Sequence, residues 1–353
     1  MERIHDSGSG GFVKESASTS SPRPVRGWES ALSGAFSLIG EKLIRVEETV
    51  NANLRSDIAP VDEAGQYIAE SAGKRIRPAL LLFCSGLLDY RGEHDVLLGA
   101  VYEFIHTATL VHDDIIDEAE VRRGRPTVNR IFGNDQTVLV GDYLYIRAVS
   151  MALEPRKLRI MDVLTETTQR MIEGEIMAHH LRGRAGVSSE EHLSIIERKT
   201  AALFEGCCRT AAILAGASTA AEERLAVFGV NLGIAFQLVD DLLDLTADEK
   251  TLGKPVASDL REGRLTHPWI DLMASGTEQD RTDIRNVLED QDFERVAFER
   301  LRARLENVGS LERTRRLAME HATRAREAIE TFPEGVYRSA LLDVTRFVLS
   351  RDR

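Results

Sequence analysis

Two clusters of aspartates place three carboxylates each within little more than one helical turn. They are HDDIID at residues 112–117 and VDDLLD at residues 239–244. Like charges at this spacing repel one another and destabilise a helix. Carboxylates one turn apart suit a hard cation such as Mg²⁺, which is usually held by one or two carboxylates plus substrate phosphates. We therefore expect paired metal sites formed by Asp113, Asp114, Asp117, Asp240, Asp241 and Asp244.

A solvated acidic helix face is the alternative interpretation of either cluster. At average composition, an isolated D-D-x-x-D arises by chance in roughly one chain of this length in twenty. Here the flanking segments are apolar, FIHTATLV before the first cluster and FQLV before the second. Because the pattern occurs twice on apolar segments, metal binding is favoured over a free surface face.

Basic segments supply the complement that a bridging anion would need. Arginine forks and lysine point charges are the usual ligands of diphosphate groups. Any one such cluster is most often a solvated helix end, but together with the acidic motifs they predict a cavity for two diphosphates. One diphosphate would bind through metal and the other through cations. The residues are Lys74, Arg75, Arg77, Arg122, Arg123, Arg125, Lys199 and Lys254.

The composition is that of a soluble globular protein. Of the 353 residues, 43% are hydrophobic and 29% are charged, and the net charge of −12 argues against a general nucleic-acid binder. The three cysteines are odd in number and lack the spacing of a zinc site, which predicts a reducing compartment. No apolar run is expected to span a bilayer. We expect a cytoplasmic protein.

The chain is predicted to be one large all-α domain from residue 28 to residue 353, because apolar residues recur at three-to-four spacing nearly throughout. Interhelical loops are expected at 183–189, 252–264 and 274–280. Residues 1–27 are rich in Ser, Gly and Pro, so we expect disorder there. Their acidic residues argue against the alternative of a transit peptide.

From about residue 30 to the end, the sequence resembles the trans-isoprenyl diphosphate synthases, or polyprenyl synthetases. The resemblance implies antiparallel helices around a deep central cavity, usually in a homodimer. It also implies 1′-4 condensation of isopentenyl diphosphate with an allylic diphosphate. It is carried by GKRIRP, FIHTATLVHDDIIDEAEVRRGRPTVN, GDYLY, EGEI, KTAALFE, GIAFQLVDDLLD and GKPVASDL, in the family's order.

The resemblance also implies roles for individual residues. Mg²⁺, with three ions per active site, would be held by Asp113, Asp117 and Asp240. Asp114, Asp241 and Asp244 would be additional ligands or hold metal-bound water. The allylic diphosphate would also contact Arg122, Lys199 and Lys254. Isopentenyl diphosphate would bind Lys74, Arg77, His106 and Arg123.

Two polar side chains would stabilise the allylic cation that forms when the diphosphate leaves. Thr200 and Gln237 would direct oxygen dipoles toward it, although an ordinary interhelical hydrogen bond is the alternative for Gln237. By itself His106 is more typical of a core histidine, and only the resemblance favours binding. The sequence departs from the family at Arg264, where many relatives have lysine, and at His267, where an aliphatic residue is usual.

Product length depends on the residues four and five positions before Asp113, Thr109 and Ala108. They lie roughly one turn deeper, and both are small where short-chain relatives carry aromatic residues. At about 1.5 Å of helix rise per residue, these positions lie about one turn below Asp113, along the path of the growing chain. Because small residues leave that path open, we expect a long product of about seven to ten isoprene units. A farnesyl or geranylgeranyl product, and a subunit of a heteromeric synthase, are the alternatives. Product release would allow peripheral membrane contact.

Two other classes fit less well. A terpene cyclase has no need of a second aspartate motif or of cations for a second diphosphate. A non-catalytic regulatory subunit is expected to have lost acidic residues, and all six aspartates are present.

Overall fold

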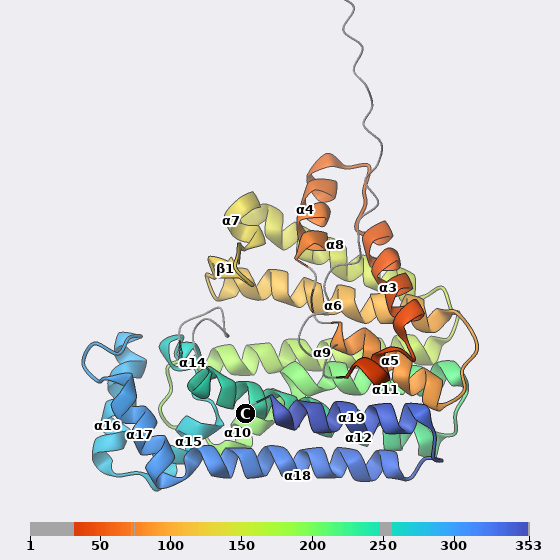
Figure 1. Ribbon diagram of the computed structural model, residues 1–353. Helices are drawn as coiled ribbons and strands as arrows, with labels where there is room; N and C mark the ends of the chain where they lie inside the picture. Colours follow the sequence, from red (N-terminus) through yellow and green to blue (C-terminus); the bar gives the residue numbers. More distant parts are fainter. Residues whose placement is uncertain (1–31, 72, 74, 248–255, 352–353) are drawn as a thin grey trace, which may run out of the picture.

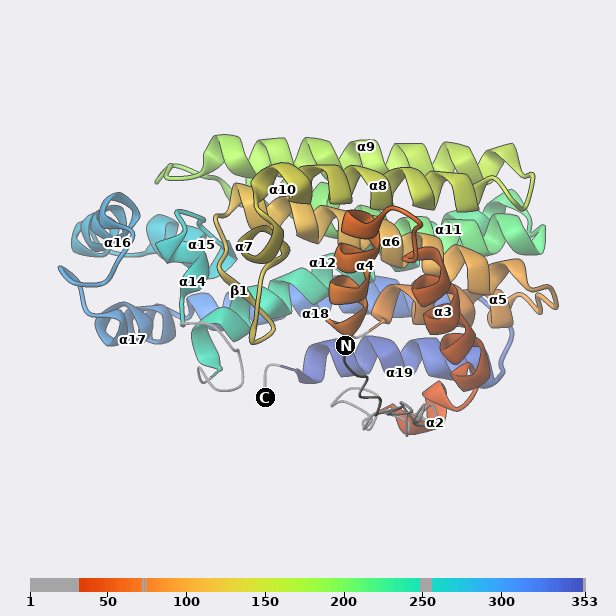
Figure 2. The ribbon, with the colours of Figure 1, turned by 90° about the horizontal axis from the view of Figure 1, so that it is seen from above.

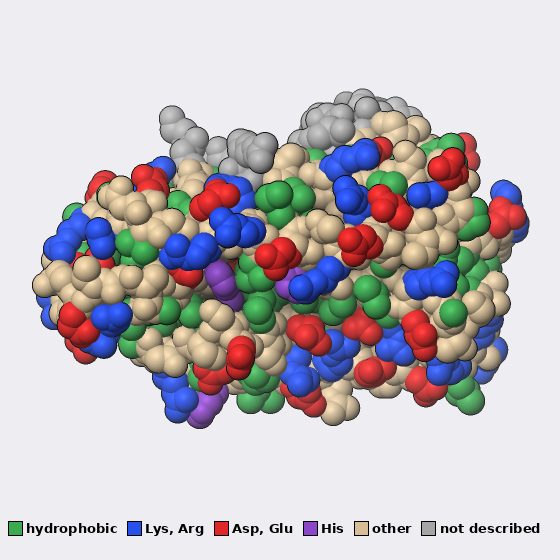
Figure 3. Space-filling model, turned by 90° about the horizontal axis from the view of Figure 1, so that it is seen from below, with side chains coloured by type: hydrophobic (Ala, Val, Ile, Leu, Met, Phe, Trp, Pro, Cys, Tyr) green, Lys and Arg blue, Asp and Glu red, His purple; other side chains and the backbone are tan. Residues whose placement is uncertain are grey.

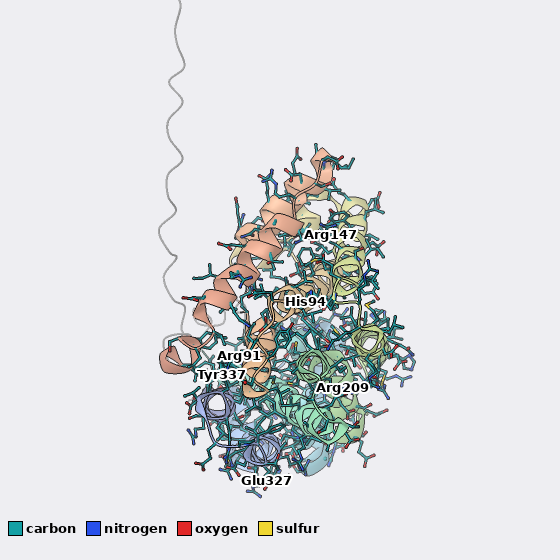
Figure 4. The ribbon with its side chains drawn as sticks, turned by 90° about the vertical axis from the view of Figure 1, so that its right-hand side faces the viewer. Arg91, His94, Arg147, Arg209, Glu327 and Tyr337 are labelled. Atoms are coloured by element: carbon teal, nitrogen blue, oxygen red, sulfur yellow. The ribbon has the colours of Figure 1, made fainter. Side chains whose placement is uncertain are left out.

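The computed structural model describes residues 32–71, 73, 75–247 and 256–351, and this part of the chain is almost entirely helical. The long helices run side by side and are seen nearly end-on in Figure 4. They are α6 (His94–Ile116), α8 (Asn134–Ala152), α9 (Leu158–Leu181), α11 (Ala202–Ala215), α12 (Thr219–Thr246), α18 (Ser310–Glu330) and α19 (Val336–Ser350).

Shorter helices complete the bundle. Figure 1 shows α3 and α4 rising above α6 and, at one end, a small lobe that contains α16 and α17. The shorter helices are α2 (Ser33–Phe36), α3 (Gly40–Asn53), α4 (Ala59–Glu70), α5 (Ile76–Leu87), α7 (Val128–Phe132), α10 (Ser189–Ile196), the π-helix η1 (Glu197–Ala201), α14 (Ser258–Arg261), α15 (His267–Ser275), α16 (Glu278–Asp290) and α17 (Phe298–Val308).

The main core lies where α5, α6, α11 and α12 pack together. Phe83, Phe104, Phe204 and Phe228 are among its fully buried side chains. A second apolar cluster, around Trp269, fills the space between α15, α16 and α17. The three-to-four spacing of apolar residues correctly predicted these helices, since each buries one stripe.

An interhelical break occurs within two of the three expected loops, although residues 274–275 and 278–280 of the loop expected at 274–280 belong to α15 and α16. Residues 182–188 separate α9 from α10, which begins with a capping box between Ser188 and Glu191. Residues 276–277 separate α15 from α16. The third expected loop, 252–264, lies partly outside the described residues and contains the short helix α14, so a loop throughout was wrong. The predicted disorder of residues 1–27 also concerns residues outside those described.

A short antiparallel hairpin follows α6. Its strands, β1 (Val121–Arg122) and β2 (Arg125–Pro126), have two residues each. The sequence analysis did not predict it. Two of the arginines that follow the first aspartate motif, Arg122 and Arg125, are paired with each other in this hairpin.

Helix α12 is long and apolar enough to cross a membrane by length and composition alone, contrary to the expectation that no segment would be. Two-thirds of its most apolar window, 67%, is buried inside the fold. Core helices of soluble proteins pass the same test, and packing explains this one.

Candidate active site

The first aspartate motif lies at the C-terminal end of α6. The helix ends at Ile116, and Asp117 caps it by donating its backbone N–H to the Asp113 carbonyl oxygen at 2.8 Å. The side chains of Asp113 and Asp117 are 17% and 20% exposed, whereas Asp114 is buried. The predicted placement of two carboxylates one turn apart therefore holds, with the helix ending just before the third aspartate.

Each carboxylate of this motif faces a cation. Lys199 Nζ lies 3.9 Å from Asp113 Oδ2, and Arg122 Nε donates to Asp114 Oδ1 at 2.7 Å. Asp117 forms ion pairs with Arg182 and Arg264. The sequence analysis did not predict either pair.

Burial makes the ionised motif costly. It raises the pKa of Asp113 to about 6, an effect that nearby Lys199 partly offsets and that Glu175 and Asp117 increase. Burial also raises the pKa of Asp114, although Arg122 opposes the shift. A carboxylate whose ionised form is disfavoured in this way is stabilised by an added cation. The electrostatics of the motif therefore favour metal binding.

The second motif lies on α12, and its three aspartates differ in surroundings. The Asp240 side chain is 35% exposed and pairs with Arg351 at 2.8 Å. Asp241 and Asp244 are buried. Asp244 accepts a hydrogen bond from Ser258 Oγ at 2.8 Å and one from the Asp259 backbone N–H at 3.3 Å. Of the three, Asp240 is the one whose side chain is open to an approaching ion.

A segment of π-helix, η1, places two polar residues between the motifs. Lys199 Nζ pairs with Glu175 Oε2 at 2.5 Å and lies 3.9 Å from Asp113 Oδ2 on α6. The adjacent Thr200 donates its hydroxyl hydrogen to Gln237 Oε1 on α12 at 2.9 Å. Single π-turns within helices often mark functional sites. Glycines allow α9 and α12 to approach η1 closely. A Cβ on Gly174 of α9 would lie 2.6 Å from the Lys199 backbone nitrogen, and one on Gly233 of α12 would lie 2.6 Å from the Ala201 Cα.

Basic side chains line a cavity beside α6. His106, Arg75 and Arg123 line a cavity of about 790 Å³, which includes its open mouth and has a mainly apolar interior of residues from α3, α4, α6 and α8. Burial, followed by the charges of Arg77 and Arg123, lowers the pKa of His106 well below its usual value. His106 is therefore neutral at neutral pH and available for hydrogen bonding to an anion.

Two arginines of the GKRIRP segment have different surroundings. Arg75 is buried and forms ion pairs with Glu47 and Glu103, which raise its pKa although burial opposes this. It ties α3 and α6 to the start of α5. Arg77 instead lies over the Phe204 ring, 5.4 Å from the centroid. Its buried Nε has no hydrogen-bond partner among the described residues, and burial lowers its pKa. An anion would satisfy Arg77, whereas Arg75 is already satisfied.

The remaining predicted residues divide between described and undescribed positions. Lys74 and Lys254 lie outside the described residues. Ala108 is 3% exposed, and Thr109 donates its hydroxyl to the His106 carbonyl oxygen at 2.8 Å. Neither Ala108 nor Thr109 lines the cavity beside His106, so their role in product length stays a prediction.

The carboxylates of the two motifs suit a partly hydrated magnesium ion better than a metal ion that is enclosed by protein ligands. Within the described residues, no group of three His, Cys, Asp or Glu side chains converges as a complete ligand shell. Magnesium does not need one, since it keeps waters and is bound through one or two carboxylates plus substrate phosphates. The partly exposed carboxylates of Asp113, Asp117 and Asp240, each now balanced by a basic side chain, fit that requirement.

Four residues at the site were missed or left unexplained from the sequence: Arg182, His192, Arg351 and His267. His192 Nε2 lies 2.9 Å from Asp241 Oδ2, and the His267 imidazole is buried and bonded to Thr314. They come from segments distant from the motifs, so no spacing rule identifies them. Only the departure of His267 from the family pattern was a signal in the sequence.

The chain is similar to proteins of known function over most of its length. The polyprenyl synthetase profile matches residues 59–303. The chain is 38% identical over 316 residues to octaprenyl diphosphate synthase of Escherichia coli (strain K12), covering 90% of this chain and 98% of that one. It is 35% identical to the all-trans-nonaprenyl-diphosphate synthase (geranyl-diphosphate specific) of Rhodobacter capsulatus, over 89% of this chain and 96% of that one.

A solved structure gives the same answer. The polyprenyl synthase of Caulobacter crescentus CB15, complexed with calcium and isoprenyl diphosphate, superimposes with a TM-score of 0.86 at 32% identity, covering 91% of this chain and 98% of that one. The fold is thus the all-α isoprenoid synthase fold. The chain belongs to the polyprenyl synthetase family.

Proposed function

We propose that this protein is a magnesium-dependent trans-polyprenyl diphosphate synthase that adds isopentenyl diphosphate to an allylic diphosphate and makes a long-chain product. One observation carries the proposal: adjacent residues of η1 lie next to the first aspartate motif and to Gln237, which precedes the second motif on α12. Lys199 faces Asp113, and Thr200 is bonded to Gln237, one turn before Asp241. A ligand at Lys199 is therefore close to the first motif and to the polar residues that precede the second.

The region around the two aspartate motifs would bind the allylic diphosphate. Magnesium, when bound by Asp113, Asp117 and Asp240, would neutralise the leaving diphosphate. Lys199 and Arg122 would pair directly with its oxygens, and Lys254, from its place in the family motif, would join them. Asp114, Asp241 and Asp244 accept hydrogen bonds from other side chains, and these contacts would hold the two motifs in position.

The basic residues at the start of α5 and beside His106 would bind isopentenyl diphosphate. Arg77 and Arg123 would contact the diphosphate as charged donors and His106 as a neutral one, and Lys74 would complete the set. Burial, together with the charge of Arg123, lowers the pKa values of Arg77 and His106, and a bound anion would stabilise positive charge on both. This binding would hold the double bond facing the allylic carbon, so that the new bond forms without competing attack by water.

The wall between the two diphosphates would stabilise the developing allylic cation. Thr200 and Gln237, whose oxygen atoms are 2.9 Å apart, would form this wall. Fixed dipoles aimed at a developing charge need no reorganisation during the reaction. After the new bond forms, a proton must be lost, and the departed diphosphate held by Lys199 would accept it.

Long products are supported by two observations. The relatives named octaprenyl and all-trans-nonaprenyl diphosphate synthase match over nearly their full lengths. Ala108 and Thr109 are small, so neither forms an aromatic floor. Products of this length would be suited to the side chains of respiratory quinones, and their apolar chains would bring a cytoplasmic enzyme into peripheral contact with a membrane for release.

The experiment that tests the proposal uses the purified protein with magnesium, farnesyl diphosphate and labelled isopentenyl diphosphate. Mass spectrometry should find a series of products that ends at about seven to ten isoprene units. Chains of this length extend past Ala108 and Thr109, which lie one helical turn below Asp113. Cyclised hydrocarbons would indicate a terpene cyclase, and products that stop at three or four units would indicate a short-chain synthase. No product without a second protein would favour a heteromeric subunit.

A homodimer is part of the proposal. Large apolar side chains are exposed on α8 and α9, which run along one side of the molecule in Figure 2. Val138, Leu139 and Ile146 of α8 are 43%, 68% and 57% exposed, and Ile172 and Ile176 of α9 are 55% and 63% exposed. Contiguous exposed apolar residues mark interaction surfaces. Light scattering should find a dimer, and Leu139→Arg should give a monomer.

Nucleic acid is not among the proposed partners. On the face shown in Figure 3, acidic and basic side chains are interspersed, without a broad area of one sign. The net charge of −12 points the same way, because backbone phosphates require a positive surface.

A further inference from the structure

A chain of hydrogen bonds connects helix α10 with the residues proposed to face the allylic cation. His192 on α10 contacts Asp241 Oδ2 at 2.9 Å, and Gln237 Nε2 contacts Asp241 Oδ1 at 3.1 Å. Thr200 in turn donates to Gln237 Oε1 at 2.9 Å. The side chains of His192 and Asp241 are only 10% and 2% exposed, so water does not replace these contacts.

The directions of these hydrogen bonds follow from the chemistry of the carboxylate. A carboxylate oxygen only accepts, so His192 must donate its Nε2–H and Gln237 must present its NH₂ group to Asp241. That leaves the carbonyl oxygen of Gln237 for the other side, where the Thr200 hydroxyl hydrogen is used. The orientation of the Gln237 amide, and of the hydroxyl beside it, is therefore determined by Asp241.

Asp241 needs a second donor to hold its orientation. It is buried on α12, and a carboxylate with one hydrogen-bonded oxygen can turn about its χ2 torsion. The His192 ring occupies the second oxygen and comes from a different helix, so it ties the carboxylate to α10. Without it, Asp241 could rotate and the amide of Gln237 could reverse.

We propose that His192 is a positioning residue: by donating Nε2–H to Asp241, it fixes the Gln237 amide and the Thr200 hydroxyl at the wall of the active site. The inference rests on the proposed function, since it assumes that Thr200 and Gln237 face the allylic cation. Groups that hold a reacting residue in place typically change activity by about 10- to 100-fold when removed.

The nearby histidine, His267, has a separate and structural role. Thr314 uses its only hydroxyl hydrogen on the Ser310 carbonyl oxygen at 3.0 Å, so His267 Nδ1 must donate to Thr314 Oγ1 at 2.8 Å. His267 thereby links α15 to α18. This contact accounts for a histidine at a position where the family usually has an aliphatic residue.

The test compares substitutions that keep or remove the donor. In His192→Gln the amide nitrogen reaches about as far as Nε2, whereas in His192→Asn it is too short and in His192→Phe it is absent. We expect kcat to fall by about 10- to 100-fold in the Phe and Asn variants and to stay within about fivefold of wild type in the Gln variant. The KM for isopentenyl diphosphate should change by less than about twofold in all three.

His321→Phe is the matched control. His321 is also a buried histidine bonded to a side chain of α12, with Nδ1 2.8 Å from Asn231 Oδ1, and Asn231 lies well before the aspartates. It should lose thermal stability to a similar degree but keep kcat. Equal kcat in the Gln and Asn variants, or equal losses in His192→Phe and His321→Phe, would overturn the role of His192. Wild-type protein that makes no product would instead overturn the proposed function.

Discussion

Arg351 Nη2 lies 2.8 Å from Asp240 Oδ1, so the residue that caps α19 neutralises the most exposed carboxylate of the second motif. The same guanidinium lies over the Phe236 ring, 4.5 Å from the centroid, one turn earlier on α12. The last helix of the chain is thus attached to the candidate metal site. An incoming cation at Asp240 has to compete with this arginine.

Replacing that arginine should make magnesium bind more readily. In Arg351→Ala, Asp240 loses a competing positive charge, and partly exposed pairs are worth about 0.2–1 kcal/mol, so half-maximal activity should need a few-fold less magnesium. Titration of initial rate against magnesium measures the change. Arg346→Ala, on an exposed arginine of the same helix, is the control and should not shift the curve. A higher magnesium requirement in Arg351→Ala would show that the arginine assists binding.

The aspartates themselves should be required for turnover. Asp113→Ala and Asp240→Ala should each lower kcat by several orders of magnitude, because each removes a proposed ligand of the metal that neutralises the leaving group. Circular dichroism should show an unchanged helical fold. Near-normal rates in excess magnesium would contradict the assignment of either residue.

The stability of the metal-free protein should depend on pH through Asp113. Its pKa in the folded state is about 6 against an ordinary value of 3.8, so the folded state prefers the protonated form. The resulting cost is absent below about pH 4, grows between pH 4 and 6, and is complete above pH 6. Asp113→Asn should therefore stabilise the protein in EDTA at pH 8, by about 1–3 kcal/mol, and by little at pH 4.

Thermal unfolding at several pH values measures this effect. Asp142→Asn, at a 67% exposed carboxylate on α8, is the control, and surface substitutions of this kind stay within about 0.5 kcal/mol. A gain in Asp113→Asn that is the same at pH 4 and pH 8 would show that charge is not the cause.

The two diphosphate sites should be separable by mutation. Arg77→Ala should raise the KM for isopentenyl diphosphate by about 10- to 100-fold, since a lost charged contact costs about 1.5–3 kcal/mol, and should affect the allylic substrate much less. Arg91→Ala is the control, because Arg91 is exposed and precedes the start of α6, whereas the first aspartate motif lies at the C-terminal end of that helix. Figure 4 labels Arg91 at the end of the bundle that faces the viewer. Equal effects on both substrates would contradict the division of the cavity.

Product length should respond to the residue at position 108. A tyrosine in place of Ala108 would close the path one turn below Asp113 and shorten the product to about three or four isoprene units, with condensation preserved. The site is only 3% exposed, so some loss of stability from overpacking is also expected. Ala325→Val, a substitution at a buried alanine of α18, should cost stability without shortening the product. An unchanged product distribution in Ala108→Tyr would place the end of the tunnel elsewhere.

Local pattern was enough to predict the helices and the two acidic motifs. Apolar spacing identifies the buried stripe of a helix such as α6, because neighbouring turns place those residues on one face. The clusters at Asp113 and Asp240 are visible because their cost is local, three like charges within a turn or so. The short hairpin at residues 121–126 and the helix α14 escaped prediction, since each is too brief for a periodic pattern.

Only the tertiary structure decided how equivalent residues differ. Asp240 and Asp241 are neighbours in the sequence, yet packing leaves one partly exposed beside Arg351 and buries the other beside His192. In the same way Arg75 is satisfied by carboxylates of two helices, whereas Arg77 keeps a buried nitrogen without a partner among the described residues. Sequence determines which side chains are present and their period along a helix. Which of them face the cavity depends on how each helix rotates against neighbours that are distant in the chain.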